Sequence, residues 1–464
     1  MTSILDGLNT VKQSLAVQQF ALSVTQRNVT NVNNPYYSRQ DLVFTDPTVA
    51  ASWATADLPG VEVWTSRNRY LDYSISRELP ELGENNIKYG ALHEIDSIMQ
   101  GAAGIGLSDS LSDFFNSFTQ LSGNPTDLNL RQQTIARAES LAYEFNRLYN
   151  DIQRVQTAAN QHVEAGVDEI NTLTSKIADL NGRIETAHAR GLSENEFSLR
   201  DERQRYIDEL ETMMGLQYFE TESGSITITT DKGEALVLGD TSWKLQIGSM
   251  AASPFHGISL NGKDITASIR SGELGGYLQI RDELIPGYLE VLDDMAAGVI
   301  ERVNDVHAQG EDLDGNIGGD FFTPFTPVTP GSNTGAARAM SVAIDDPRAV
   351  AAAAAGAEIG DNTNAKALAA ISEEKLFTGN TQTASEIYAS LIYRIGSDER
   401  DAEGTIAVQQ NLLDQLQGQR NATSGVDLNE EAINLIKFQR AYQASSRFAT
   451  VLNSLSEEIL QFVR

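Results

Sequence analysis

Both ends of the chain carry apolar residues that recur at alternating steps of three and four residues. Near the N-terminus these apolar residues are Ile4, Leu8, Val11, Leu15, Leu22, Val29 and Val32. Polar Gln18 and Thr25 occupy two further positions of the same series. Near the C-terminus it consists of Leu428, Ala432, Leu435, Phe438, Tyr442, Ser445, Ala449, Leu452, Leu455, Ile459 and Phe462. This heptad spacing predicts two long helices, at 4–32 and 428–462, each with one narrow apolar stripe.

A narrow stripe buries too little surface to order a long helix by itself, so each terminal helix needs a partner. The other terminus is the nearest candidate, and the same pair in a neighbouring copy of the chain is a second one. An ordinary coiled-coil stalk is the alternative that the spacing leaves open.

The N-terminal helix runs into the stretch "RNVTNVNNPYYSRQ", residues 27–40. Asparagine side chains compete for backbone hydrogen bonds, and a residue before proline is pushed out of the α region, so Asn34 and Pro35 predict a helix stop. The C-terminal helix has two candidate N-caps, Asn429 and Asp427, with Glu430 and Glu431 in its first turn.

Composition excludes several classes of protein. A length of 464 residues predicts two to four domains, and a formal charge of -30 disfavours binding to nucleic acid or to an anionic membrane. Without cysteine the chain has no disulfide, thiolate metal site or cysteine nucleophile. The N-terminal "MTSILDGLNT" lacks the basic and apolar regions of a signal peptide, so we expect no general secretion.

The interior of the chain alternates between segments with a helical pattern and segments with a β-strand pattern. Helical patterns cover 71–99, 107–120, 128–190, 196–214, 274–307 and the stretch from 364 to 419. A β-rich region begins near residue 216, where "SGSITITTDKGEALVLG" predicts a hairpin with a D-K-G turn. It includes 242–248, 258–269 and 321–344, and the last of these contains proline-rich connecting material, "FFTPFTPVTPGSN".

This order predicts a mainly α fold with a β-rich insert, in nested and discontinuous domains. The expected parts are an N-terminal core helix and turn (1–40) paired with a C-terminal core helix (428–464), a helical bundle in two parts (41–215 and 359–427), and a small β-rich outer domain (216–358), whose helix 274–308 can return to the bundle.

The candidate catalytic and metal-binding motifs of the sequence each lack required residues. "HEIDS" at 93–97 lacks the second histidine of a zinc protease motif, and "DLDGNIGGD" at 312–320 lacks the glycine and glutamate of an EF-hand where Ile317 and Thr323 stand. A solvated turn is the ordinary interpretation of the second motif. We therefore expect no catalytic, cofactor-binding or metal-binding residues, and no enzyme.

Two terminal motifs carry a resemblance. "SVTQRNVTNVNNPYYSRQ" and "SGVDLNEEAINLIKFQRAYQASSRF" resemble the N- and C-terminal signatures of flagellar rod, hook and hook-associated proteins, in the order expected of that family. Interior segments such as "GELGGYLQIRDELIPGYLEVLDDMAAGVIERVNDVHAQGEDLDGNIGGDFF" are similar to its hook-filament junction members, so the resemblance covers nearly the whole chain.

The resemblance implies a structural adaptor that joins hook to filament as a ring within the axial tube. It implies contacts with copies of itself, the hook protein, a second junction protein and a dedicated export chaperone that binds within 428–464, and export to the cell exterior by the flagellar type III system. The implied assembly residues of the N-terminal helix are Ile4, Leu8, Val11, Leu15, Leu22 and Val29. The implied signature turn contains Asn28, Asn31, Asn33, Pro35, Tyr36, Tyr37 and Arg39. The implied assembly and chaperone residues of the C-terminal helix are Leu435, Phe438, Gln439, Tyr442, Ala444, Leu452, Leu455 and Ile459.

One residue departs from the family pattern, because Tyr36 stands where the family usually has glycine after the proline. A type II turn would require a positive φ at this position, which strains tyrosine, so we expect a type I turn over residues 34–37. A hook or distal-rod subunit is the alternative within the family, although the helical block 107–210 argues against it. A flagellum-associated cell-wall hydrolase is the alternative from another class.

Overall fold

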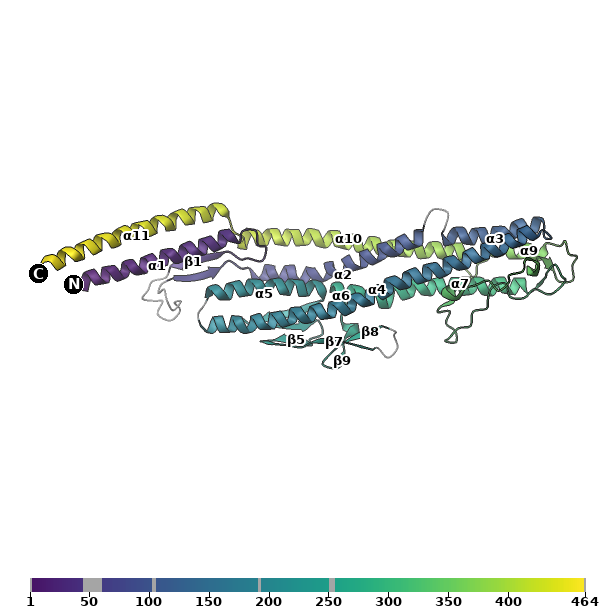
Figure 1. Ribbon diagram of the computed structural model, residues 1–464, viewed down its shortest axis with the longest axis horizontal. Helices are drawn as coiled ribbons and strands as arrows, with labels where there is room; N and C mark the ends of the chain where they lie inside the picture. The colour runs from purple at the N-terminus through teal and green to yellow at the C-terminus, as the bar shows by residue number, and fades with distance from the viewer. Residues whose placement is uncertain (1, 45–60, 102–105, 191–192, 250–254, 463–464) are drawn as a thin grey trace. The chain divides into compact units, whose positions relative to one another are not determined.

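The computed structural model describes residues 2–44, 61–101, 106–190, 193–249 and 255–462 (Figure 1). The chain forms two compact units, each assembled from separate segments. Unit 1 comprises Met1–Gly83, Gly166–Gly272 and Ala407–Arg464, and unit 2 comprises Glu84–Ala165 and Glu273–Ile406. Three of the four boundaries fall inside the long helices α2 (Arg69–Gln100), α4 (Leu128–Ala189) and α10 (Ala384–Ser424), so each of these contributes to both units, and the fourth follows Gly272.

Unit 1 contains the terminal helices and most strands. Its other elements are α1 (Thr2–Thr30), β1 (Gln40–Phe44), β2 (Val61–Thr65), α5 (Ser193–Met213), β3 (Leu216–Glu220), β4 (Ile226–Thr230), β5 (Ala235–Leu238), β6 (Thr241–Ser242), β7 (Leu245–Ser249), β8 (His256–Leu260), β9 (Lys263–Asp264), the 3-10 turn Thr266–Ser268 and α11 (Leu428–Phe462). The predicted helix at 428–462 is confirmed residue for residue. The N-terminal helix ends at Thr30, two residues earlier than the predicted end, because Asn31 bonds back to the Arg27 carbonyl oxygen.

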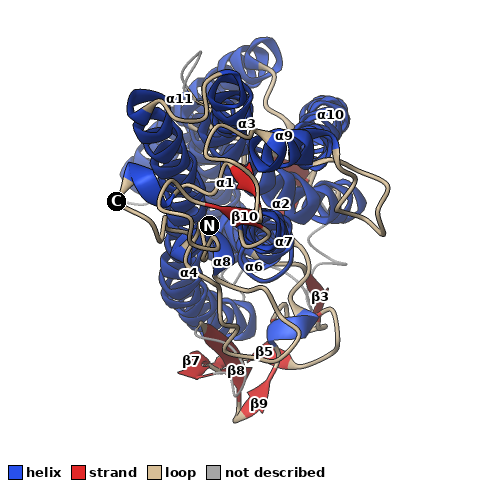
Figure 2. Cartoon of the chain, turned by 90° about the vertical axis from the view of Figure 1, so that its right-hand side faces the viewer, coloured by secondary structure: helices blue, strands red, loops and turns tan. Residues whose placement is uncertain are grey.

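Antiparallel sheets make up the β-rich part of unit 1. The strands pair in the orders β3-β4-β5-β6 and β7-β8-β9, with Ile228 opposite Val237 in the hairpin predicted around the D-K-G turn. Asn181 of α4 donates hydrogen bonds of 2.8 Å to the carbonyl oxygens of Ile226 and Gly239. These bonds fix the first sheet to α4, and Figure 2 shows the strands β5, β7, β8 and β9 gathered together.

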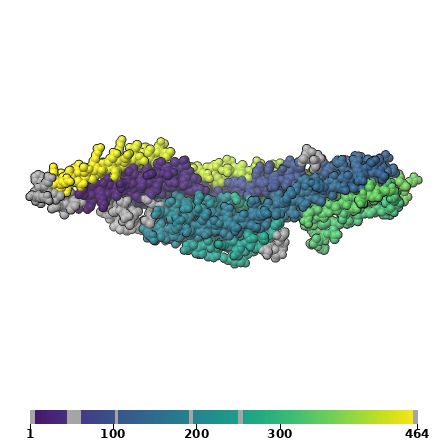
Figure 3. Space-filling model, viewed as in Figure 1, coloured from purple at the N-terminus to yellow at the C-terminus, as the bar shows by residue number. Residues whose placement is uncertain are grey.

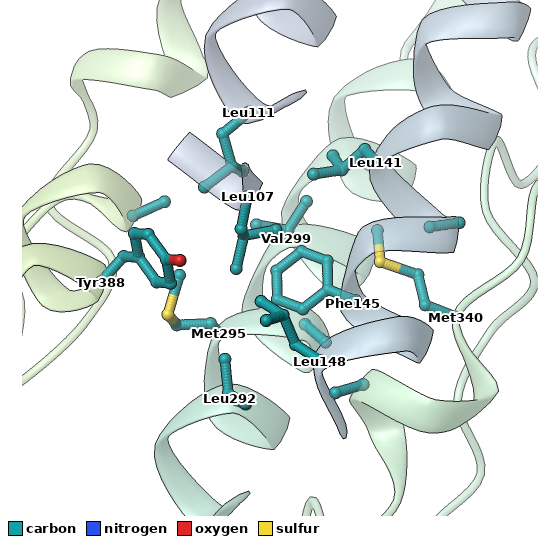
Figure 4. Packing of buried hydrophobic residues seen from close by; sticks show 14 of the residues in the cluster. Leu107, Leu111, Leu141, Phe145, Leu148, Leu292, Met295, Val299, Met340 and Tyr388 are labelled. Carbon is teal, nitrogen blue, oxygen red and sulfur yellow. The ribbon is translucent and has the colours of Figure 1, made fainter. Parts of the chain in front are cut away.

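Unit 2 is a helical bundle around a large apolar core. Its elements are α3 (Leu107–Gly123), α6 (Gly272–Gln279), the π-helical turn Ile280–Leu284, α7 (Ile285–His307), β10 (Gly310–Glu311), α8 (Ala336–Ala339), the 3-10 turn Pro347–Ala349, β11 (Ala353–Ala354), α9 (Thr363–Ala370) and the 3-10 turn Ile371–Glu373, with parts of α2, α4 and α10. Figure 4 shows Phe145, Leu148, Val299 and Met295 packed together at its centre. The π-helical turn precedes Pro286, which lacks the N–H of a regular ladder.

The prediction that residues 321–344 belong to the β-rich region is wrong. Only the bridge between Phe322 and Val342 forms there, and α8 interrupts it. Phe321 and Phe322 instead fill the core of unit 2 against Phe114, at ring distances of 5.8 and 5.5 Å. The division between the two units also cuts the predicted β-rich segment 216–358 after residue 272. The predicted domain boundaries therefore stay predictions.

Candidate assembly interface

The two terminal helices pack side by side and run in opposite directions (Figures 1 and 3). Gly7 faces Leu452, because a Cβ atom added at this glycine would lie 3.3 Å from a Leu452 methyl carbon. Seven residues further along α1, the Ser14 hydroxyl lies 2.9 Å from that of Ser445, which is seven residues earlier in α11. The pair is therefore an antiparallel coiled coil with a seven-residue repeat on both helices.

Small residues of α1 set the close approach of the two helices. Continuing the register places Ala21 opposite Phe438, and both side chains are buried. The same register places Asn28 opposite Glu431, and both side chains are buried. Positions 7, 14, 21 and 28 thus carry glycine, serine, alanine and asparagine, one in each heptad.

The predicted residues of α1 differ in how deeply the structure buries them. Val11 is buried, whereas Leu8, Leu15 and Leu22 are half-buried and Val29 is exposed. The side chain of Ile4 lies outside the described residues. The covered face of α1 keeps Val11 and Thr25 of the predicted series, but Ala21 and Asn28 are buried in place of Leu22 and Val29, which follow them by one residue. The buried residues of α1 are Val11, Ala21, Val24, Thr25 and Asn28.

In α11, the predicted stripe divides into a covered part and an exposed part. Phe438 is buried, and Tyr442 and Leu452 are half-buried. Gln19 of α1 donates a hydrogen bond of 3.4 Å to the Tyr442 hydroxyl. The remaining predicted residues Leu435, Gln439, Ala444 and Leu455 are exposed, and the side chain of Ile459 lies outside the described residues.

The exposed apolar residues of α11 leave surface that α1 does not cover. Phe448, Val451 and Leu455 follow one another at steps of three and four, so they share one flank of the helix. The other exposed apolar residues of α11 are Leu428, Ile433, Leu435 and Ile436. Exposed apolar side chains that share one helix face form a candidate interaction site. We call Phe448, Val451 and Leu455 the open stripe.

The signature turn takes the predicted type. The Tyr37 N–H donates to the Asn34 carbonyl oxygen at 3.1 Å, which closes a four-residue turn. Tyr36 is not among the described residues with positive φ, and no described peptide bond is cis, so the turn is type I. The expectation for Tyr36 is confirmed. Asn33 and Pro35 are exposed in this region, and the Asn34 side chain accepts from the Tyr36 N–H at 3.1 Å.

Asn28 connects the end of α1 to the first strand. Its side-chain amide donates to the Gln40 carbonyl oxygen at 2.9 Å, and its oxygen accepts from the Gln40 N–H at 3.1 Å. The same oxygen accepts from the Tyr37 hydroxyl at 2.7 Å. All three groups are buried or half-buried, so the asparagine replaces the backbone partners that the chain loses where the helix ends.

Arg39 ties the signature turn to the start of α11. Its guanidinium bonds to Glu430 and, at 3.0 Å, to the buried Glu431. Its backbone N–H donates to the Ser424 carbonyl oxygen at 2.9 Å, just before α11. The N-cap of α11 is Asp427, whose carboxylate accepts from the Asn429 N–H, so of the two predicted caps Asn429 is wrong and Asp427 is right.

Arg420 of α10 is a residue of this joint that the sequence did not reveal. Its guanidinium donates to the carbonyl oxygens of Pro35 and Tyr36 and, at 2.8 Å, to the buried carboxylate of Asp72. Arg67 holds the other oxygen of Asp72 at 2.7 Å. Because Arg420 follows the turn by 385 residues and belongs to no motif, no local pattern marks it.

Buried carboxyl groups lie on α5 beneath the joint. Burial raises the pKa of Glu211 to about 8, partly offset by a hydrogen bond from Ser76, and the nearby Asp208 and Asp231 raise it further. Burial likewise raises the pKa of Asp201 to about 7, although Arg67 opposes the shift. These groups favour the protonated form more than exposed acids do.

The acidic turn at 312–320 is held by the chain's own hydrogen bonds. Asp312 accepts from the N–H groups of Asp314 and Asn316 at 2.7 and 2.9 Å. Asp314 pairs with Arg348 rather than facing Asp312 across an ion site. His93 of the "HEIDS" motif bonds to Glu399 at 2.8 Å. In the described segments no three histidine or acidic side chains are placed to hold a metal ion, and no described helix is long and apolar enough to cross a membrane.

Comparison with protein families places the chain among the axial proteins of the bacterial flagellum. The model described as "Flagellar hook-associated protein FlgK helical domain" matches residues 92–322, and the model described as "Flagellar basal body rod FlgEFG protein C-terminal" matches residues 417–462. Within that class, the chain is similar to flagellar hook-associated protein 1.

Relatives match over nearly their full length. Flagellar hook-associated protein 1 of Bacillus subtilis is 28% identical, with 99% of this chain and 98% of that protein covered. The protein of the same name from Escherichia coli is 23% identical, with coverages of 98% and 99%. The solved structure of the flagellar hook junction protein FlgK from Burkholderia pseudomallei shares the fold, with a TM-score of 0.66 and 16% identity over 76% of this chain and all of that one. The recognition and the mainly α fold expected from the sequence are thereby confirmed.

Proposed function

We propose that this chain is a structural adaptor subunit of the flagellum that joins hook to filament and assembles through its terminal helices. The observation that carries the proposal is the antiparallel pair α1 and α11, whose open stripe remains uncovered within the chain. Similarity to flagellar hook-associated protein 1 over nearly the whole chain supports the place of assembly. The pair forms the inner wall of the axial tube, and the open stripe packs against the next subunit.

The partners follow from that place. Copies of the chain form a ring, one edge of which contacts the hook protein while the other contacts a second junction protein. Neither contact requires chemistry, because the adaptor acts by shape and by the strength of its packing. The chain is therefore not an enzyme. A cell-wall hydrolase, the alternative from another class, would clear purified peptidoglycan in a zymogram, and we expect no clearing.

Export explains how such a chain reaches the junction. An open apolar stripe in the cytoplasm invites premature association, so a dedicated chaperone covers region 428–464 until the chain is unfolded and passes through the flagellar type III channel. The mature subunit then lies outside the cell. Pull-down of the full chain with and without residues 428–464 tests the chaperone site, and equal recovery of the chaperone would contradict it.

Electron microscopy of the source bacterium tests the proposed function. Cells that lack this chain should build hooks without filaments, and the wild-type gene should restore the filaments. Val451→Asp places a charge in the open stripe and should block this restoration, whereas Val408→Asp, at a more exposed valine of α10, should restore filaments normally. Filaments of normal number in the deletion strain would overturn the proposal.

A further inference from the structure

A loop of unit 2 carries a threonine-proline pair at every third residue. The loop is "TPFTPVTPGS", residues 323–332, and we call it the threonine-proline loop. Its three pairs are Thr323-Pro324, Thr326-Pro327 and Thr329-Pro330. No charged residue occurs between 321 and 337, although charged residues make up 21% of the chain. The loop therefore differs in composition from the acidic surface of the rest of the protein.

Both ends of the loop are fixed to the core of unit 2. Before the loop, Phe321 and Phe322 are buried, and the side-chain oxygen of Asn304 accepts from their N–H groups at 2.9 and 2.8 Å. After the loop, the Asp293 carboxylate accepts from the Gly335 N–H at 2.8 Å. The chain thus presents the loop from a fixed base on α7.

Proline keeps the loop extended. Each proline fixes its own φ at about −65°, and the residue before each proline avoids the α region. Between residues 323 and 330 these restrictions leave out Phe325 and Val328 alone. Residues 324–328 make no backbone hydrogen bond to the described part of the chain, and Val328 is 97% exposed. The backbone of the loop is therefore extended and open to solvent.

Two threonine hydroxyls of the loop are unused by the fold. Threonines on the helices bond back to the carbonyl oxygen one turn earlier, as Thr157 of α4 does. The Thr323 hydroxyl lies 2.9 Å from that of Ser341 and is hydrogen-bonded to it. Thr326 and Thr329 are exposed, and their hydroxyls have no hydrogen-bond partner among the described residues. These two hydroxyls are free to react.

We infer that Thr326 and Thr329 are sites of O-linked glycosylation. Uncharged, exposed segments rich in threonine and proline have the composition of O-glycosylated stalks. An acceptor that is already extended loses little conformational entropy when a transferase binds it. The added sugars also cover the apolar surface of Val328, which lies between the two sites in the sequence. The inference goes beyond the proposed function and does not depend on it.

The modification is a glycosyl transfer from a nucleotide-activated sugar. The threonine Oγ1 forms a bond to the anomeric carbon, and the bond between that carbon and the phosphate oxygen breaks. The nucleoside diphosphate leaves with the electron pair of that bond, and a base of the transferase takes the hydroxyl proton. A protein kinase is a less suitable enzyme for this loop, because kinases recognise charge patterns that residues 321–337 do not supply.

Mass spectrometry of the full chain purified from the source bacterium tests the inference. Trypsin releases residues 303–338 as one peptide, because no lysine or arginine lies between Arg302 and Arg338. We expect this peptide to carry sugar on Thr326 and Thr329, located by electron-transfer fragmentation. The same peptide from a host without protein glycosyltransferases should carry none. An unmodified peptide from the source bacterium, or phosphate on either threonine, would overturn the inference.

A second threonine shows whether exposure alone selects the site. Thr126 is also exposed, and its hydroxyl has no hydrogen-bond partner within the segments that the structure describes. It precedes no proline and lies beside Asp127. We therefore expect Thr126 to remain unmodified. Equal occupancy by sugar at Thr126 would contradict the assignment to the threonine-proline loop.

Replacing both hydroxyls completes the test. A chain with Thr326→Val and Thr329→Val keeps the shape of the two side chains, and circular dichroism verifies its folding. This double variant, made in the source bacterium, should lose all sugar from peptide 303–338, whereas Thr126→Val should retain it. Sugar that persists on the peptide of the double variant would overturn the assignment. If the deletion strain keeps its filaments, the proposed function fails, but the result on this peptide is unaffected.

Discussion

Single side chains hold together the joint between the terminal helices and the rest of unit 1. Asn28 satisfies both backbone groups of Gln40, Arg39 reaches the first turn of α11, and Arg420 binds the carbonyl oxygens of Pro35 and Tyr36. Each bond crosses between segments that no helix or sheet ladder connects. The joint therefore depends on side chains where most of the fold depends on apolar packing.

Replacing Asn28 with alanine should loosen this joint. The change leaves two buried backbone groups of Gln40 without partners, at a cost of about 1–3 kcal/mol. Hydrogen exchange of the Gln40 amide should accelerate roughly 5- to 150-fold as a result. Asn33→Ala, at an exposed position of the same turn, serves as the control and should leave this rate unchanged. Unchanged exchange in Asn28→Ala would contradict the role of the side chain.

Glu211 predicts a pH dependence of stability. Its pKa is about 8 in the folded chain against an ordinary value of 4.5, because the carboxyl is buried. The folded state thus binds the proton more tightly than the unfolded state, so this contribution is fully present below pH 4.5 and is lost as pH rises to about 8.

Denaturant unfolding at a series of pH values tests this contribution. Glu211→Gln should make the free energy of unfolding of unit 1 less dependent on pH between 4.5 and 8. Glu202→Gln, at an exposed position of the same helix, should retain the wild-type dependence. Identical pH profiles for Glu211→Gln and the wild type would show that the carboxyl titrates normally.

At the scale of elements, the terminal helices were predictable and their contact face was not. Heptad spacing gave the bounds of α11, and the asparagines before Pro35 predicted the region where α1 stops. Spacing alone favoured the bulky stripe of Leu8, Leu15 and Leu22. The structure buries Val11 and Thr25 of the predicted series, but it buries Ala21 and Asn28 where the spacing favoured Leu22 and Val29.

A substitution at one of the small residues of α1 tests how the two terminal helices pack. Ala21→Leu adds three carbon atoms where the register places Phe438, and overpacking of this kind costs about 1–3 kcal/mol. Amide exchange at Val24 should accelerate accordingly. Ala432→Leu makes the same change on the exposed side of α11 and should have little effect. Equal effects of the two variants would mean that the helices do not pack in this register.

The candidate site was predictable only in part. Motif residues such as Asn28 and Arg39 could be located from the signature, but their partners Gln40 and Glu431 could not be assigned from spacing. Arg420 binds Asp72 and the carbonyl oxygens of Pro35 and Tyr36, which lie far from it in the chain, so only the folded structure brings these groups together. The segment 321–344 was assigned to the β-rich region, but its residues Phe321 and Phe322 fill the core of unit 2 through contacts that the sequence order does not show.

At the scale of the whole molecule, two compact units share three continuous helices. The core of unit 2 contains Phe145, and Ile184 is fully buried in unit 1. If contacts define cooperative units, damage to one core should affect amides of that unit most.

Paired core substitutions test this division. Phe145→Ala should cost about 3–5 kcal/mol and accelerate exchange at Val299 more than at Ile228. Ile184→Ala, with a cost of about 2–5 kcal/mol, should do the reverse. Equal acceleration at both reporter amides in both variants would show that the chain unfolds as one cooperative unit.

Cryo-electron microscopy of the isolated junction between hook and filament tests the central claim most directly. The account predicts a ring of this chain at the junction, with α1 and α11 lining the tube and with Phe448, Val451 and Leu455 in contact with the neighbouring subunit. A junction that lacks the chain, or one in which the terminal helices face the outside of the tube, would contradict it.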